Sequence, residues 1–232
     1  VTEEAARHHV ALCVHESIKD TGLRRTYPNL MTRESARGQE YNAWAGEGSN
    51  PPDHLVTLPF TRMLSGPMDY TPGIFGLEFK EYRPNNRINA TIVNQMALYV
   101  VLYSPLQMAA DLPENYEKRL DLFQFIEDVP ADWQDTRVLN ASIGDYVTIA
   151  RQDRHSEDWY LGSITDEQGR VLEAPLSFLS PGKKYTATIY RDGDMADWKT
   201  RPYDAVIEDK VVDSSTTLKI RLAPGGGQAI RF

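Results

Sequence analysis

Three glutamates and a histidine lie in a polar stretch of the sequence that has neither a helical nor a strand period. His15 and Glu16 open the run HESIKDTGLRRTYPN, and Glu34 and Glu40 lie in TRESARGQEYNAW, residues 32–44. Carboxylates that meet at one place can bind a hard cation such as Ca2+, which takes roughly six to eight oxygen ligands. They can also work as an acid and base pair in glycoside hydrolysis, where one protonates the leaving oxygen and the other activates water.

The positions of these residues relative to apolar runs suggest a shared site. His15 and Glu16 directly follow VALCV, residues 10–14, an entirely apolar run typical of a strand in a parallel sheet covered on both faces. Parallel α/β folds place their active sites at the carboxyl ends of such strands. Asp69, in GPMDYTP, ends another strand-like segment, and we expect it at the same mouth. Its side chain would either contact a substrate or cap the next turn.

Arginines offer an alternative explanation for the same glutamates. Arg24, Arg25, Arg33 and Arg37 are interleaved with them and could pair with them in a solvated loop. The residue pattern alone favours this ion-paired loop, because a bare pair of glutamates is weak support for a catalytic site. Trp44, in the same stretch, would either stack on a sugar ring or pack within its loop.

Elements of two kinds surround this stretch. The first part alternates helix and strand around a long loop-rich region, residues 16–52. The last helix is opened by Pro113, and the one before it is stopped by Pro105, since proline cannot donate a backbone hydrogen bond. The helical segments are TEEAARHH at 2–9, DHLVTLPFTRML at 53–64 with an interruption at Pro59, NATIVNQMALYVVLYSP at 89–105 and LPENYEKRLDLFQFIEDV at 112–129.

The second part is all-β. Residues 137–232 alternate apolar and polar positions, with turns about every ten residues, as in a small antiparallel β-sandwich. This sandwich would either bind carbohydrate or stabilise the first part, and its hairpin turns favour the second role. We therefore divide the chain into an α/β part, residues 1–133, and a β-sandwich domain, residues 134–232.

The α/β part contains too few strands to form a closed barrel. About three barrel-type strands can be counted, whereas a (β/α)8 barrel needs eight. Unpaired strand edges do not stay exposed in water without protection. We expect the α/β part to be the C-terminal portion of such a barrel, completed by a missing N-terminal portion of the same protein or by another polypeptide.

Composition excludes several functions. The chain of 232 residues has a net charge of −8 and a pI near 5.2, without a cluster of Lys and Arg, so nothing indicates binding to nucleic acid or insertion in a membrane. Cys13 is the single cysteine, which rules out an internal disulfide and a cysteine-based zinc site. We expect it to be a packed small apolar residue.

Two long motifs resemble one known family. The run HESIKDTGLRRTYPNLMTRESARGQEYNAW, followed by TLPFTRMLSGPMDYTPG, is similar to glycoside hydrolase family 97, the SusB-like α-glucosidases of bacterial polysaccharide utilisation. The resemblance implies three successive domains, namely a β-supersandwich, a catalytic (β/α)8 barrel and a C-terminal sandwich. The chain would contain the last third, and the protein would be periplasmic.

The resemblance also implies roles for the site residues. Glu40 would be the general acid and Glu16 the general base acting on an oligosaccharide substrate. Glu16, Glu34 and Glu40 would bind Ca2+ together with a glutamate of the missing N-terminal portion. His15 would contact the sugar whose bond is broken.

The residue at position 16 bears on the stereochemistry. Retaining members of the resembled family, which include α-galactosidases, carry glycine where Glu16 stands and use an upstream aspartate. The resemblance therefore implies a calcium-dependent, inverting α-glucosidase. The alternatives are an α-galactosidase of the same family and a non-catalytic glycan-binding protein on the same scaffold.

Overall fold

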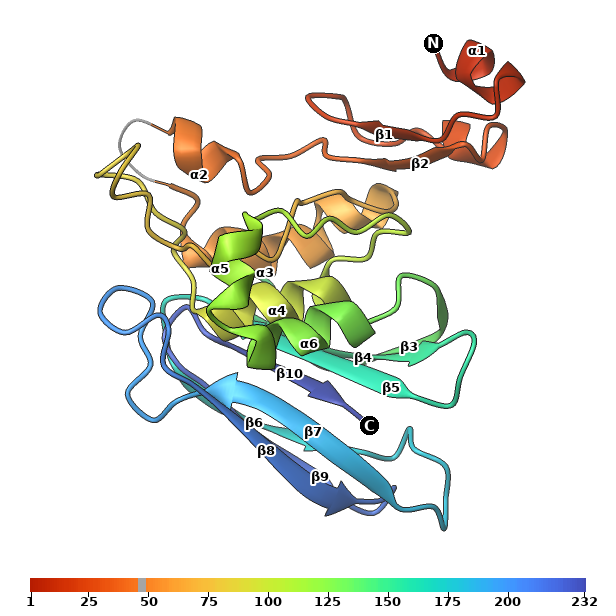
Figure 1. The fold of residues 1–232 in the computed structure, drawn as a ribbon. Coiled ribbons are helices and arrows are strands. Elements are labelled where there is room, and N and C mark those ends of the chain that lie inside the picture. Colours follow the sequence, from red (N-terminus) through yellow and green to blue (C-terminus); the bar gives the residue numbers. More distant parts are fainter. Residues whose placement is uncertain (46–48) are drawn as a thin grey trace.

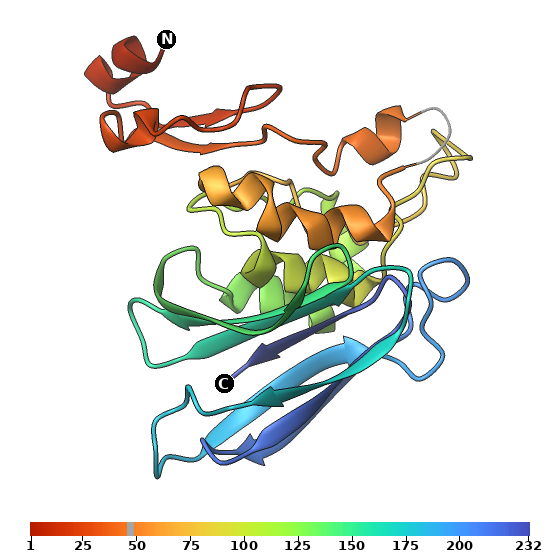
Figure 2. The ribbon, with the colours of Figure 1, turned by 180° about the vertical axis from the view of Figure 1, so that it is seen from behind.

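The computed structural model describes residues 1–45 and 49–232, and these residues are arranged in successive layers. Figure 1 shows α1, β1 and β2 with the N-terminus at one end, helices in the middle and the β-sandwich at the other end. The view from behind shows the same order (Figure 2). Within the described residues, no helix combines the length and apolarity that a membrane crossing requires.

A short parallel sheet lies next to the N-terminus. It consists of β1 (Leu12–Val14) and β2 (Leu30–Arg33), and Met68 adds a parallel bridge to Arg33. These three parallel segments agree with the three barrel-type strands counted from the sequence. The position of one of them was not predicted, because β2 lies within residues 16–52, where we expected a loop-rich region. Its four residues, LMTR, are too few to show a strand period.

The helical segments follow the predicted order, with one correction. The segment predicted as a single helix over 112–129 is divided into α5 and α6, because Arg119 leaves the helical conformation at φ −144° and ψ 51°. This break lets Tyr116 pack against Phe75 on one side and Phe123 on the other. The helices are α1 (Thr2–Arg7), η1 (Leu23–Arg25), α2 (Tyr41–Trp44), α3 (Pro52–Thr57), η2 (Leu58–Phe60), η3 (Arg62–Ser65), α4 (Ile92–Val101), α5 (Pro113–Glu117) and α6 (Leu120–Asp128).

The C-terminal part is the predicted antiparallel β-sandwich. A six-stranded sheet, in the order β3-β4-β5-β10-β7-β8, faces the two-stranded sheet β6-β9. Leu161, Ile189 and Ile230 of the larger sheet meet Leu218 and Ile220 of the smaller one in a shared core. The strands are β3 (Trp133–Ser142), β4 (Tyr146–Asp153), β5 (Trp159–Thr165), β6 (Arg170–Pro175), β7 (Tyr185–Asp192), β8 (Ala205–Val212), β9 (Thr217–Leu222) and β10 (Gly227–Arg231).

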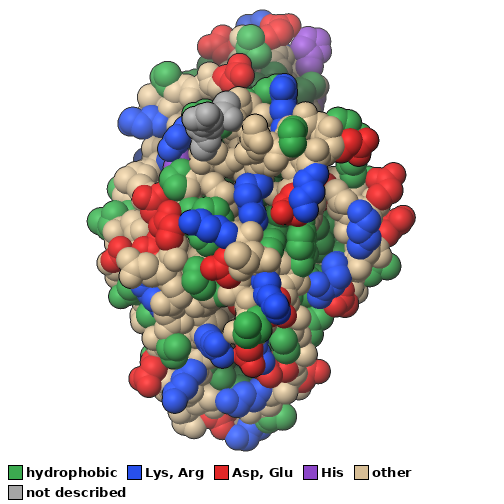
Figure 3. All heavy atoms as spheres, turned by 90° about the vertical axis from the view of Figure 1, so that its left-hand side faces the viewer, with side chains coloured by type: hydrophobic (Ala, Val, Ile, Leu, Met, Phe, Trp, Pro, Cys, Tyr) green, Lys and Arg blue, Asp and Glu red, His purple; other side chains and the backbone are tan. Residues whose placement is uncertain are grey.

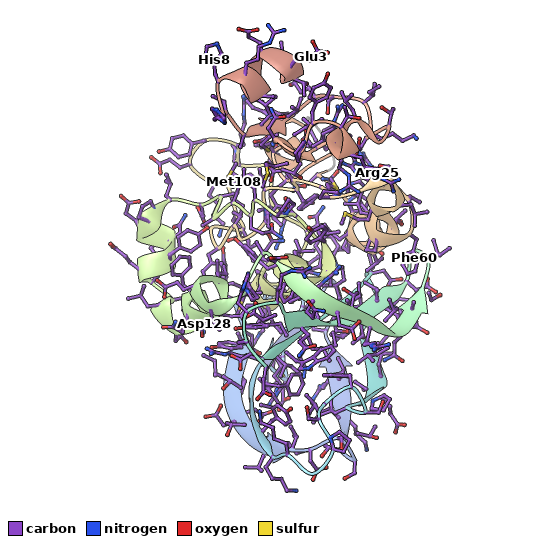
Figure 4. The ribbon with its side chains drawn as sticks, turned by 90° about the vertical axis from the view of Figure 1, so that its right-hand side faces the viewer. Glu3, His8, Arg25, Phe60, Met108 and Asp128 are labelled. Carbon is purple, nitrogen blue, oxygen red and sulfur yellow. The ribbon has the colours of Figure 1, made fainter. Side chains whose placement is uncertain are left out.

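Helices cover the second face of the larger sheet. Figure 4 places Asp128, at the end of α6, where this helix meets the sandwich. Its carboxylate binds Arg231 of β10 at 2.7 Å, and its backbone carbonyl accepts a hydrogen bond from Tyr160 of β5. One apolar core runs from the helices into the larger sheet. The boundary proposed at 133/134 coincides with the start of β3, but packing is continuous across it.

Helix α4 is the centre of this packing. All ten of its residues are buried, and Thr91 caps its N-terminus by accepting a hydrogen bond from the backbone N–H of Asn94. Two glycines of the sheet let its backbone come close. A Cβ at Gly162 would lie 2.6 Å from the carbonyl oxygen of Ala97, and one at Gly227 would lie 2.5 Å from the Cα of Asn94.

We therefore predict that Gly162→Ala destabilises the protein by about 1–3 kcal/mol, because the added methyl group forces α4 away from the sheet. The free energy of unfolding from urea denaturation measures this effect. Gly169→Ala is the matched control, since its Cβ would meet its nearest neighbour, the carbonyl oxygen of Leu222, at 3.2 Å. Equal stability of the two variants would contradict the close-approach argument.

Candidate active site

The site is built at the carboxyl ends of the three parallel segments. His15 directly follows β1, and Glu34 directly follows β2. Asp69 follows Met68, which bridges to β2. Backbone hydrogen bonds fix these ends together, since Glu34 N–H donates to Val14 O and Asp69 N–H donates to Arg33 O. The convergence expected for His15, Glu34 and Asp69 is thus present in the structure.

The His15 ring bridges carboxylates on its two sides. Its Nε2 lies 2.7 Å from Oδ2 of Asp69, which is fully buried. Its Nδ1 lies 3.5 Å from Oε2 of Glu40 and 3.8 Å from Oε2 of Glu34. Burial by itself would lower the pKa of His15, but the hydrogen bond and charge of Asp69, with the charges of Glu34 and Glu40, outweigh burial and raise it. The imidazolium form is therefore favoured between these carboxylates.

Cys13 belongs to the same cluster, which corrects its prediction as a simple packed apolar residue. Its thiol donates a hydrogen bond to Oδ2 of Asp69 at 2.8 Å. Burial, followed by this hydrogen bond and the charge of Asp69, raises the pKa of Cys13 to about 12. The thiol is therefore held in its protonated form as a donor. The alternation of a strand could have predicted this position, because residues 13 and 15 point to the same face.

Glu34 is held in place by its surroundings. Its side chain is nearly buried, and Oε2 accepts a hydrogen bond from the backbone N–H of Glu16 at 2.9 Å. Its other oxygen packs against Gly38, where a Cβ would lie only 2.5 Å away. A side chain at position 38 would therefore displace the carboxylate.

Arg62 fixes the backbone around Glu34, and sequence reasoning missed it. Its buried guanidinium donates to the carbonyl oxygens of Arg33 at 2.8 Å, Glu34 at 3.0 Å and Pro67 at 3.0 Å. It thereby joins the end of β2 to the segment that leads to Asp69. Burial lowers the pKa of Arg62. Nothing in the run LPFTRML distinguishes this arginine from a solvent-exposed one, because its acceptors are carbonyl groups distant in the sequence.

Three strained residues mark the strand ends. Glu16, Ser35 and Thr71 have φ values of +52°, +53° and +55°. Such conformations cost of the order of 1 kcal/mol for residues other than glycine, and they concentrate at functional sites. Here each one follows a cluster residue by one or two positions. The turns after His15, Glu34 and Asp69 therefore use a left-handed backbone conformation that residues other than glycine seldom adopt.

Glu40 is the accessible carboxylate of the cluster. It immediately precedes α2, and its side chain is 53% exposed. The neighbouring Gln39 is buried, and its side-chain amide donates to the side chain of Gln95 on α4. Its backbone N–H donates to Tyr70 O at 3.0 Å. The core helix thus holds the residue next to Glu40.

The structure places Glu16 differently from Glu34 and Glu40. Its backbone contacts Glu34, but its side chain is exposed and forms no hydrogen bond or ion pair with a described residue. It lies outside the group formed by His15, Glu34 and Glu40, whose ligand atoms all lie within 4.8 Å of one another. The role of Glu16 as a base and metal ligand stays a prediction.

The arginine alternative is wrong for these glutamates. Arg24 pairs with Asp20 at 2.6 Å, Arg33 donates to the carbonyl oxygen of Ile18, and Arg37 lies over the ring of Tyr41. Across the described residues, no arginine forms an ion pair with Glu16, Glu34 or Glu40. Neither the carboxylate of Glu34 nor that of Glu40 is neutralised by a described arginine, although Oε2 of Glu34 already accepts the hydrogen bond from the backbone N–H of Glu16. Carboxylate oxygens suit a hard cation such as Ca2+, although two carboxylates supply only part of its usual ligand set.

Parallel strand ends that carry carboxylates, followed by an antiparallel β-sandwich, define an α/β part joined to an all-β domain. Two family models match the chain. Residues 1–36 match "Glycoside hydrolase 97", and residues 132–232 match "Glycosyl-hydrolase 97 C-terminal, oligomerisation". The chain belongs to glycoside hydrolase family 97 and is the C-terminal part of such a protein.

Relatives and solved structures agree with this family. The chain is 37% identical over 99% of its length to a retaining alpha-galactosidase of Bacteroides thetaiotaomicron, and 32% identical over 97% to a probable retaining alpha-galactosidase of Streptomyces bingchenggensis. It covers 35% and 32% of these proteins. A family 97 enzyme from Pseudoalteromonas sp. strain K8, solved with panose and with acarbose, superposes with a TM-score of 0.95 and is 54% identical over the whole chain, which covers 36% of it. The chain thus spans about a third of the relatives it matches.

We predict that Asp69→Asn lowers the pKa of His15, because it removes the buried negative charge 2.7 Å from Nε2. NMR titration of the His15 ring in metal-free buffer measures this shift. Asp132→Asn is the matched control, since Asp132 lies 3.3 Å from His155 in the sandwich and should leave His15 unchanged. An unchanged His15 pKa in the Asp69 variant would contradict the bridging role of this ring.

Proposed function

We propose that the protein to which this chain belongs hydrolyses α-glucosidic bonds with inversion, with Glu40 as general acid and Glu16 as general base. The observation that carries the proposal is the position of Glu40. It is solvent-accessible, lies 3.5 Å from His15 and has no arginine partner among the described residues, so it is available to a substrate. A non-catalytic glycan-binding protein would not require this arrangement.

The chemistry follows from two separated carboxyl groups. Glu40, protonated, donates to the glycosidic oxygen as the bond to the anomeric carbon breaks. Glu16, ionised and exposed, accepts a proton from a water on the opposite face of the sugar. His15, fixed by Asp69 on one ring nitrogen, orients its other nitrogen toward Glu40 and the reacting sugar.

The preference for glucosides rests on two observations. Identity is higher with the Pseudoalteromonas enzyme, solved with panose and acarbose, than with the proteins named retaining alpha-galactosidases. Glu16 also stands where, by the family resemblance, retaining members carry glycine. The names of the two curated relatives favour the alternative, a retaining α-galactosidase.

Two measurements on the full-length protein separate these functions. We expect p-nitrophenyl α-glucoside to be hydrolysed faster than the α-galactoside, and NMR to detect β-glucose as the first product, because inversion changes the anomer. A preference for the galactoside, with α-galactose as first product, would replace this proposal by the alternative.

Substitution of the acid tests the assignment directly. Glu40→Gln should lower kcat on maltotriose by about 10²–10⁴-fold, the usual contribution of general acid catalysis. Glu117→Gln, on the exposed face of α5, is the matched control and should retain wild-type kcat. Wild-type turnover by the Glu40 variant would show that another group is the acid.

The proposal includes Ca2+ held by Glu34 and Glu40, with Glu16 and a glutamate of the N-terminal portion. Their oxygens are the ligand type that Ca2+ takes, and the bound ion would supply positive charge beside the reacting sugar. Chelation should lower the Tm of the full-length protein, and added Ca2+ should restore it, because a ligand that binds only the folded state stabilises it. Glu34→Gln should reduce this Tm shift, whereas Glu127→Gln on α6 should keep it. A Tm independent of Ca2+ would remove the metal from the proposal.

The remaining parts of the proposal concern assembly and location. The N-terminal portion of the same protein would add the strands and the metal ligand that the α/β part lacks, and an oligosaccharide would bind across the completed mouth. Relatives about three times as long as the chain support this arrangement. The protein would act in the bacterial periplasm.

A further inference from the structure

A small apolar cleft lies beside Glu40. It has a volume of about 250 Å3 and is lined by Trp44 of α2, Ile74, Phe79 and Thr71, among others. Among the described residues that line it, Glu40 is the only charged one. The same carboxylate therefore faces both this cleft and His15 of the cluster.

Trp44 is displayed to solvent on this cleft. The residue is 73% exposed in the described part of the chain, so of the two roles expected for it, packing within its loop is the less favoured. The turn that carries it is nevertheless firmly held. The backbone N–H of Asn50 donates to Oδ1 of Asn42 at 2.8 Å, and the side chain of Asn86 donates to the carbonyl oxygens of Asn42 and Ala43.

The segment around Asn86 lies next to α2 in both ribbon views (Figures 1 and 2). Holding a large aromatic ring in contact with water costs free energy, because its apolar surface is not buried. This cost is offset when a ligand covers the ring.

We propose that this cleft is the subsite for the leaving-group sugar, with Trp44 as its stacking platform. The inference rests on the proposed function and deepens it. A general acid must lie within hydrogen-bond distance of the glycosidic oxygen, so the ring that departs lies on the side of Glu40. The cleft occupies that side.

The lining defines the ligand. An apolar aromatic surface covers the C–H face of a pyranose ring. None of the lining residues that the structure describes is basic, which fits a neutral sugar rather than an acidic one. The volume is smaller than that of typical pockets for larger ligands, which begin at about 300 Å3, so one ring fits. The neutral ring on the reducing-end side of the broken bond is therefore bound here.

Comparison of two substrates on the full-length protein tests the subsite. Maltotriose has a sugar as leaving group, whereas α-glucosyl fluoride has none. Trp44→Ala should lower kcat/KM for maltotriose about tenfold more than for the fluoride, and Trp44→Phe should retain most of the preference. Leu120→Ala, which removes an exposed apolar side chain from α6, is the matched control and should lower neither value.

The outcomes separate this inference from the proposed function. Equal losses on both substrates, or a lower Tm that accounts for the loss, would overturn the subsite and indicate that Trp44 packs against another part of the protein. If the wild-type protein cleaves neither substrate, the proposed function fails. Calorimetric binding of maltose then decides the subsite, since equal Kd values for wild type and Trp44→Ala would overturn it.

Discussion

The close contact between α4 and the six-stranded sheet is the constraint on which the rest of the structure depends. Gly162 and Gly227 allow the helix backbone to lie directly on the sheet, and the helix is fully buried. From its other side, Gln95 binds Gln39, the residue before Glu40. The sandwich thus supports the site through a rigid helix. A supporting role for the sandwich follows from this geometry, and precise positioning of a catalytic carboxylate requires such support.

Negative charge is concentrated at the site, where few positively charged side chains lie close to the carboxylates. The His15 ring lies between Asp69, Glu34 and Glu40, and their charges raise its pKa, while the neighbouring arginines bind elsewhere. On the face that Figure 3 shows, acidic and basic side chains are interspersed. A local excess of carboxylates costs free energy through repulsion, and a cation or a shared proton relieves it. The same imbalance that destabilises the isolated cluster makes it suitable for a metal and for acid–base chemistry.

Backbone strain and an exposed aromatic ring both occur where the chemistry is proposed. The positive φ values of Glu16, Ser35 and Thr71 occur at the strand ends, and the exposed Trp44 lies on α2 beside Glu40. Helix α4, in contrast, is fully buried. The regular core supplies the stability that offsets these local costs. Arg62 contributes by joining the end of β2 to the segment that leads to Asp69 through the carbonyl oxygens of Arg33, Glu34 and Pro67.

The sequence by itself determined the fold class and named His15, Glu16, Glu34, Glu40 and Asp69 as candidate site residues. Apolar runs, proline positions and alternation predicted the helices and the sandwich, and long motifs identified the family and its glutamates. Tertiary structure decided what depends on distant residues. It brought Cys13 and His15 together on the carboxylate of Asp69, gave the arginines other partners, exposed Trp44, and divided one predicted helix into α5 and α6. Local sequence fixes the period and chemistry of a segment, but the partner of a side chain is set by packing between segments far apart in the chain.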